Sequence, residues 1–284
     1  MDLQLHTSRD AAETTALHTG PHLALRAWGV PFRLSAETGS LLERMRAHAP
    51  FGSTECDRQS SAIHTFTLRS VEADGHYRVQ FGDQLLVDAA KLDSALIQLG
   101  GHMMMHVAEH SPDYVFLHSG VVGWQNRALL LPGASFAGKS TLVAELVRAG
   151  ATFYSDEFAL IDAEGRVHPF PRDLQLRSPG RVEQTVVPLA QLEGRAGKEP
   201  IPVSLVIFTQ FAEDARWSPE PVSPGRAVLE LLLHSTPVQR APARVLATLT
   251  AMMRNATAWR SPRGEASAAA RSLLAALAAG GPPA

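Results

Sequence analysis

The spacing of apolar positions in the first third of the chain predicts a mixed region of helices and short strands. A helical period over residues 38–48 is followed by apolar runs that turn signals interrupt at Asp74-Gly75 and Gly82-Asp83. Runs punctuated in this way predict a small antiparallel sheet. A longer helix is predicted over residues 91–109, where leucine, methionine and valine recur at helical spacing.

The pattern changes near Tyr114, where longer apolar runs begin. Two of these runs, residues 114–122 and 127–131, flank Gln125-Asn126 and predict a β-hairpin whose second strand leads directly into Gly133. The elements predicted next are a helix over residues 140–148 and strands over residues 152–155 and 158–162. The sequence therefore predicts a strand, a loop, a helix and a further strand in succession.

The remaining pattern predicts one long strand and three helices. The strand covers residues 203–211, and the helices cover residues 227–234, 244–254 and 265–277. The expected organisation is a flexible N-terminus (1–22), a small mixed α/β region (23–112) and a larger α/β (α+β) domain (113–284). The small region carries no recognisable chemistry and is a candidate surface for docking an acceptor.

Charge and cysteine content narrow the classes of partner and compartment. Lys plus Arg number 26 and Asp plus Glu number 28, so the net charge of −2 gives no electrostatic case for nucleic acid or an anionic membrane. The single cysteine, Cys56, has no internal disulfide partner. No apolar run approaches the roughly 20 residues of a membrane span, and the N-terminal stretch lacks the apolar core of a signal peptide. We expect a cytoplasmic protein.

The segment after the predicted hairpin fits the phosphate-loop, or Walker A, pattern of Gly, four residues, Gly, Lys and Ser or Thr. Its residues are Gly133, Ala134, Ser135, Phe136, Ala137, Gly138, Lys139, Ser140 and Thr141. Glycines allow successive N–H groups to converge on an anion at the start of a helix. Lys139 would supply charge to the outer phosphates, and the Ser140 hydroxyl would hold magnesium. The alternative is a glycine-rich turn without a ligand, but the predicted strand before and helix after favour a phosphate site.

Two adjacent acids, Asp156 and Glu157, follow the next predicted strand. A nucleotide enzyme needs one carboxylate to position magnesium and one to accept a proton from the attacking hydroxyl. The alternative is a solvated acidic turn. His118 ends the first strand of the predicted hairpin, and its spacing alone indicates a structural or surface histidine rather than a catalytic one.

Taken in order, these residues resemble the kinase domain of the HPr kinase/phosphorylase family, which has a phosphoenolpyruvate-carboxykinase-like P-loop fold. The resemblance lies in the order and spacing of His118, the Gly133–Thr141 loop and the acidic pair, and it covers roughly residues 114–234. It implies ATP and Mg²⁺ as cofactors, Ser140 and Asp156 as metal ligands, and His118 as a catalytic group beside Lys139. Weaker similarities in residues 174–177 and 221–226 favour phosphate-binding roles for Arg177 and Arg226, ahead of the other nearby arginines.

Departures from the family pattern modify these expectations. Thr141 and Gln175 stand where family members carry glutamate, which removes a carboxylate that assists the metal and puts reverse phosphorolysis in doubt. The pattern is closer to divergent HPr-kinase-related proteins, some of them associated with ribosomal and lasso-peptide biosynthesis. That similarity implies a serine in a peptide as the acceptor, and either Asp156 or Glu157 as the base.

The leading hypothesis is therefore a kinase that phosphorylates a serine of a peptide or small protein, such as a lasso precursor peptide. Two alternatives remain: a kinase of a small-molecule hydroxyl, and an ATP-binding regulatory module without catalysis. Nucleic acid and membrane are not expected as partners, and the resemblance suggests a homo-oligomer.

Overall fold

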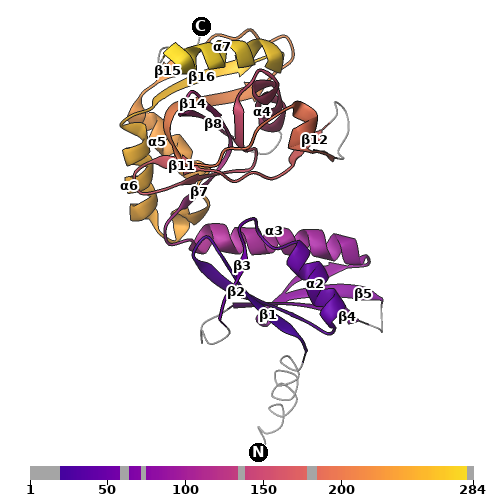
Figure 1. Ribbon diagram of the computed structural model, residues 1–284. Helices are drawn as coiled ribbons and strands as arrows, with labels where there is room; N and C mark the ends of the chain where they lie inside the picture. Colours follow the sequence, from indigo (N-terminus) through magenta and orange to yellow (C-terminus); the bar gives the residue numbers. More distant parts are fainter. Residues whose placement is uncertain (1–19, 58–63, 72–74, 134–137, 178–183, 280–284) are drawn as a thin grey trace, which may run out of the picture. The chain divides into compact units, whose positions relative to one another are not determined.

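The structure is a computed structural model, and the chain falls into two compact units, Met1–Pro112 and Asp113–Ala284. The residues that it describes are 20–57, 64–71, 75–133, 138–177 and 184–279 (Figure 1). The predicted flexible N-terminus lies almost wholly outside these ranges, as do residues 134–137 of the phosphate-loop motif. The two units are described separately below.

The first unit is a six-stranded sheet with two helices. Its strands are β1 (His22–Ala27), β2 (Val30–Ala36), β3 (Thr54–Glu55), β4 (His64–Val71), β5 (His76–Phe81) and β6 (Gln84–Ala89), in the spatial order β3-β1-β2-β4-β5-β6. The predicted antiparallel pairing holds for β4, β5 and β6, with the β5–β6 turn at Gly82 and Asp83. The complete sheet is larger than the small antiparallel sheet that was predicted, and it is mixed because β2 and β4 pair in parallel.

Both helices predicted in this region are present. Helix α2 (Gly39–Ala47) begins after Thr38, whose hydroxyl accepts a hydrogen bond from the Leu41 N–H at 3.2 Å and so caps the helix. Helix α3 (Leu92–His110) buries the apolar stripe expected from its spacing. A Cβ on Gly100 would lie 3.1 Å from the His48 carbonyl oxygen, so this glycine permits a close approach between α3 and the end of α2.

The second unit is a larger mixed α/β structure built on an eight-stranded sheet. Its strands and its 3₁₀ turns η2 and η3 are β7 (Val115–Trp124), β8 (Arg127–Pro132), β9 (Thr152–Ser155), β10 (Phe158–Ile161), β11 (Arg166–His168), β12 (Leu174–Arg177), β13 (Gln184–Val187), η2 (Leu189–Leu192), β14 (Ile201–Phe211), β15 (Glu220–Val222), η3 (Thr236–Gln239) and β16 (Thr257–Arg263). The main path runs β11-β10-β7-β8-β14-β16-β15, β9 pairs with β7, and β12 and β13 form a separate ribbon.

The predicted hairpin at the start of this unit is confirmed. Gln125 and Asn126 form its turn with φ values of 49° and 61°. Two consecutive left-handed residues give the turn a twist that matches the flanking strands, and asparagine tolerates this conformation better than most residues. The hairpin makes β7 and β8 antiparallel, and β8 then runs parallel to β14.

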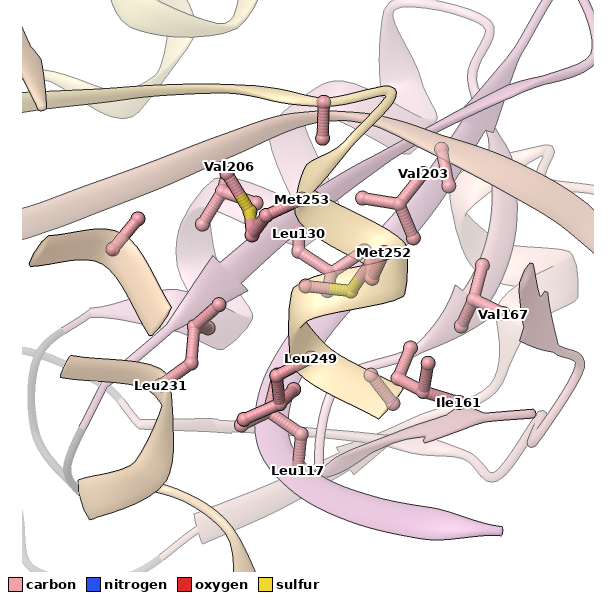
Figure 2. Close-up of a cluster of buried hydrophobic side chains, with 14 of the residues drawn as sticks. Leu117, Leu130, Ile161, Val167, Val203, Val206, Leu231, Leu249, Met252 and Met253 are labelled. Atoms are coloured by element: carbon pink, nitrogen blue, oxygen red, sulfur yellow. The ribbon is translucent and has the colours of Figure 1, made fainter. Parts of the chain in front are cut away.

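Four helices cover the two faces of this sheet, which gives a three-layer arrangement (Figure 1). They are α4 (Lys139–Arg148), α5 (Pro224–Leu233), α6 (Pro242–Met253) and α7 (Ala266–Ala279). On one face, Leu249, Met252 and Met253 of α6 lie over the strands that carry Leu130 and Val206 (Figure 2). On the other face, α4 and α7 pack together over the alternate side chains of the same strands.

The sequence pattern missed several short strands in this unit. Strand β16 was not predicted because it contains Pro262, which removes a backbone donor and argues against a strand. It nevertheless pairs in parallel with β14 over residues 257–263. The ribbon β12–β13 and strand β15 were missed as well. Over the described ranges, none of the helices has the length and apolar character to cross a membrane.

Candidate phosphate and metal site

The phosphate-loop motif lies between the end of β8 and the start of α4. Gly133 follows β8, and its N–H donates to the His118 carbonyl at 3.4 Å. Gly138 precedes α4 with a φ of 78°, a left-handed conformation that glycine adopts without a steric penalty. The first N–H groups of α4 have no partner within the helix, so the end of the motif presents donors at the positive end of a helix dipole. Residues 134–137 of the predicted loop lie outside the described ranges.

Lys139 is buried at this helix terminus, with only 8% of its surface exposed. Its Nζ donates to the Gly133 carbonyl at 2.8 Å, which holds the side chain back across the loop. Burial lowers the pKa of Lys139 to about 8, and the nearby Asp156 carboxylate partly opposes this effect. The amine is thus a poorly solvated cation, which interacts strongly with an anion.

Asp156 lies in the turn between β9 and β10 and faces the first turn of α4. Its carboxylate accepts a hydrogen bond from the Ser140 side chain and another from the Gln175 N–H at 3.3 Å. Burial raises the pKa of Asp156 to about 6, and the neighbouring Glu157 charge acts in the same direction. The structure therefore places the two predicted metal ligands, Ser140 and Asp156, in direct contact.

Glu157 has a different environment from its neighbour. Its carboxylate forms an ion pair with Arg172, and its side chain is 42% exposed. Its backbone is fixed on both sides, because its N–H donates to the Ser155 hydroxyl at 3.1 Å and its carbonyl accepts the Ser119 N–H at 3.1 Å. The acidic pair thus consists of Asp156, a desolvated carboxylate that contacts Ser140 of α4, and Glu157, a more accessible carboxylate paired with Arg172.

His118 lies within β7 and not at the end of a strand as predicted, and it is beside Gly133 because the next residue, Ser119, pairs with Pro132 of β8. Its N–H donates to the His234 carbonyl at 2.8 Å, and its own carbonyl receives the Gly133 N–H. Burial lowers the pKa of His118 to about 4, and the positive charges of Lys139 and His234 add to the effect. The imidazole is consequently neutral at neutral pH and acts as a hydrogen-bonding group rather than a cation.

Two of the predicted site residues, Arg226 and Thr141, are not brought into this cluster by any described contact. Arg226 is 70% exposed on its side chain and pairs with Glu230 at 3.3 Å. Arg177 ends β12, and its side chain lies outside the described part of the structure. Thr141 is exposed on α4 and takes the position of the family's glutamate without replacing its charge.

Three residues that sequence reasoning did not select belong to the site. Arg172 pairs with Glu157, as described above. Burial lowers the pKa of His234, and the Lys139 charge lowers it further, which places this imidazole close to the lysine. Arg263, at the end of β16, donates from Nη2 to the Gly138 carbonyl at 2.6 Å. Neither the lone histidine nor the two arginines carry a local sequence signal that would have identified them.

The donor set fits magnesium bound together with a phosphate. Magnesium takes one or two protein oxygens and completes its shell with phosphate oxygens and water. The Asp156 carboxylate and Ser140 hydroxyl are two such oxygens, already in contact. Within the described residues there is no cluster of three or more His, Cys, Asp or Glu side chains suited to a metal. A magnesium ion held by these two oxygens would need further oxygen ligands from a phosphate group or from water.

Comparison with known proteins does not assign the chain to a family. No family model matches it, and no curated protein is significantly similar to it.

Proposed function

We propose that this protein is an ATP- and magnesium-dependent kinase that transfers the γ-phosphoryl group to a serine hydroxyl of a peptide or small protein. The observation that carries the proposal is the convergence of Lys139, Ser140 and Asp156 at the start of α4. The strand, loop, helix and strand order around them supports a P-loop kinase fold of the phosphoenolpyruvate-carboxykinase type.

In this proposal each described residue has one task. Lys139 and the first N–H groups of α4 bind the phosphates, and Ser140 and Asp156 hold the metal. Magnesium, when bound, neutralises charge on the phosphates. His118 is neutral and steadies an outer phosphate oxygen by a hydrogen bond.

Glu157 is the proposed proton acceptor, because Asp156 is engaged with Ser140 while Glu157 is more accessible. As the acceptor oxygen bonds to the γ-phosphorus, the bond from that phosphorus to the bridging oxygen breaks and ADP leaves. The hydroxyl proton passes to the carboxylate, so atoms and charge balance. Arg172 orients Glu157 and has to release it partly for the carboxylate to act as a base.

The test is transfer of labelled phosphate from ATP to serine-containing peptides. We expect Lys139→Ala and Asp156→Asn each to abolish transfer. Lys198→Ala and Asp113→Asn change the same residue types at exposed positions elsewhere in the same unit and should leave transfer unchanged. Transfer that survives both site variants would overturn the site assignment.

The same assay separates the two rival functions. Transfer to a small hydroxyl compound but to no peptide would identify a metabolite kinase. Tight ATP binding without transfer to any acceptor would identify a regulatory module, and either result would overturn the peptide-kinase proposal.

A further inference from the structure

The end of β16 carries a buried arginine that has no task in the phosphoryl transfer proposed above. Arg263 is only 2% exposed, which makes it the largest fully buried side chain among the described residues. Its guanidinium donates from Nη2 to the Gly138 carbonyl at 2.6 Å and from Nη1 to the Gly264 carbonyl at 3.1 Å. It also lies over the Phe211 ring, 5.7 Å from the ring centroid. Arg263 therefore bridges β16 and the start of α4.

The charge of Arg263 has no close counterpart in the part of the chain that is described. The acceptors of its two hydrogen bonds are backbone carbonyls, and its Nε is buried without a hydrogen-bond partner among those residues. The Glu265 carboxylate acts on it through space. A guanidinium does not lose its proton in proteins, so its burial is costly unless an anion compensates for it.

The contact with Gly138 reinforces the direction of a backbone donor that α4 already sets, because the Gly138 carbonyl also accepts the Leu142 N–H at 3.2 Å. The carbonyl of Gly138 and the N–H of Lys139 belong to one planar trans peptide, so they point in opposite directions. When Arg263 holds the carbonyl, the Lys139 N–H is held facing away from the arginine. That N–H is one of the donors at the start of α4 that the helix itself cannot satisfy.

The guanidinium of Arg263 on β16 packs closely against Gly138 at the start of α4. A Cβ on Gly138 would lie 2.5 Å from Nη2 of Arg263 and 3.4 Å from Cβ of Phe211. The second glycine of the motif is therefore required for two reasons, its left-handed conformation and the space that the guanidinium occupies.

We propose that Arg263 is a positioning residue of the phosphate site, which orients the Gly138–Lys139 peptide and supplies a buried positive charge that an oligophosphate balances. This inference rests on the proposed function and names the ligand chemistry that the site selects. Lys139 and Arg263 are the buried Lys and Arg side chains of the described residues, and both act on this helix terminus. Together they favour a ligand with several negative charges over one with a single carboxylate or phosphate.

A purely structural role is the rival explanation, in which Arg263 only fastens β16 to the loop. The two roles differ in what a neutral hydrogen-bond donor would do at this position. Arg263→Gln retains a donor for the Gly138 carbonyl and loses the charge, whereas Arg263→Met loses both. If fastening is the whole role, ligand affinity should not depend on the charge, and only the stability of the ligand-free protein should change.

The experiment measures binding of inorganic triphosphate and of ATP with magnesium to the full chain by calorimetry. Thermal unfolding of each variant is followed with and without triphosphate. Arg260→Met is the matched control, because Arg260 lies on the same strand but is exposed and pairs with Glu230. We expect triphosphate affinity to fall about tenfold in Arg263→Gln and further in Arg263→Met, with a smaller ligand-induced rise in melting temperature. Arg260→Met should bind as the unchanged protein does.

The possible results separate this inference from the proposed function. Unchanged triphosphate affinity in Arg263→Gln would overturn the inference while leaving the phosphate site intact, and this variant gives the answer even if Arg263→Met does not fold. Weakened binding in Arg263→Gln, without phosphoryl transfer by the unchanged protein, would support the inference and overturn the kinase proposal. Failure of the unchanged protein to bind either ligand would overturn both.

Discussion

Asp88 of the first unit and Asp156 of the second have pKa values displaced in opposite directions. In the first unit, Asp88 accepts from Arg78 at 2.8 Å and contacts His76 at 2.5 Å, and these hydrogen bonds lower the pKa of Asp88. In the second unit, burial raises the pKa of Asp156 to about 6. Pairing favours the charged form and burial opposes it. A carboxyl group whose pKa is raised toward neutral pH beside a buried lysine is typical of a functional site, whereas a paired surface carboxylate is not.

The cationic side chains named here also differ in burial and pairing between the two units. Arg44 and Arg46 of the first unit lie on the surface and pair with Asp93 and Glu55, at 2.6 and 2.9 Å. Such exposed pairs contribute little to stability. Lys139 in the second unit is buried next to a helix terminus, where its interaction with an anion is weakly screened. The comparison favours the second unit as the place of the proposed chemistry, and substitutions of its residues in turn test this.

The largest effect is expected for Lys139→Ala. The substitution removes the buried charge that faces the phosphates, and we expect phosphoryl transfer to fall by about 10³-fold or more. The assay is the initial rate of peptide phosphorylation at saturating acceptor, with Lys198→Ala as the exposed control. A rate within tenfold of the unchanged protein would show that this amine is not in the site.

A smaller effect is expected for Glu157→Gln. Loss of a general base reduces the rate by about 10²-fold, while ATP affinity is retained because Asp156 and Ser140 are untouched. Asp156→Asn should instead weaken binding of magnesium with ATP. Calorimetry and steady-state rates on the two variants separate these tasks, and an exchanged outcome would reverse the roles assigned to the two acids.

The pH dependence of the rate should report the shifted pKa values of Asp156 and Lys139. The ratio kcat/KM for ATP is expected to fall below pH 6 as Asp156 gains a proton and above pH 8 as Lys139 loses one. Because burial holds the pKa of His118 near 4, this residue should add no limb between pH 5 and pH 9. A flat rate up to pH 10 would show that Lys139 has an ordinary pKa.

The smallest effect concerns stability. The raised pKa of Asp156 means that its ionised form is disfavoured in the folded protein, a cost present at pH 7 and relieved as the pH falls through 6. Asp156→Asn should therefore raise the free energy of unfolding by about 1 kcal/mol at pH 7, after allowance for solvent screening, with less gain at pH 5. Asp88→Asn should give no such gain, because it removes a paired acid. Denaturant titration of both variants at both pH values is the measurement.

Local signals predicted much of the fold. Local patterns predicted helix α3, the turn at Gln125-Asn126 and the helix that begins at Lys139. These elements depend on residues that are close together in the sequence. The parallel pairing of β2 with β4 and of β14 with β16 was not predicted. Such pairings join segments that are distant along the chain, and no local pattern records them.

In the candidate site, too, local motifs identified some residues, whereas residues that are distant along the chain were missed. The phosphate-loop motif predicted Lys139 and Ser140 as site residues, and the end of the following strand predicted Asp156. The structure brings these three residues together. Arg263 was missed because it follows Pro262 at the end of an unrecognised strand, and its contact with Gly138 exists only after β14 and β16 have paired. Arg226 was chosen by resemblance, yet it is exposed and paired with Glu230.

The hydrogen bond from Arg263 to Gly138 joins residues 125 positions apart. On a ribosome, which releases the chain from its N-terminus, the helix after Lys139 emerges long before β16 does. The contact at the start of α4 therefore forms only after β16 has been synthesised and has paired with β14. A truncated product that ends before β16 would lack the arginine that holds the Gly138 carbonyl, and under the proposed function we expect it to bind a phosphate ligand more weakly.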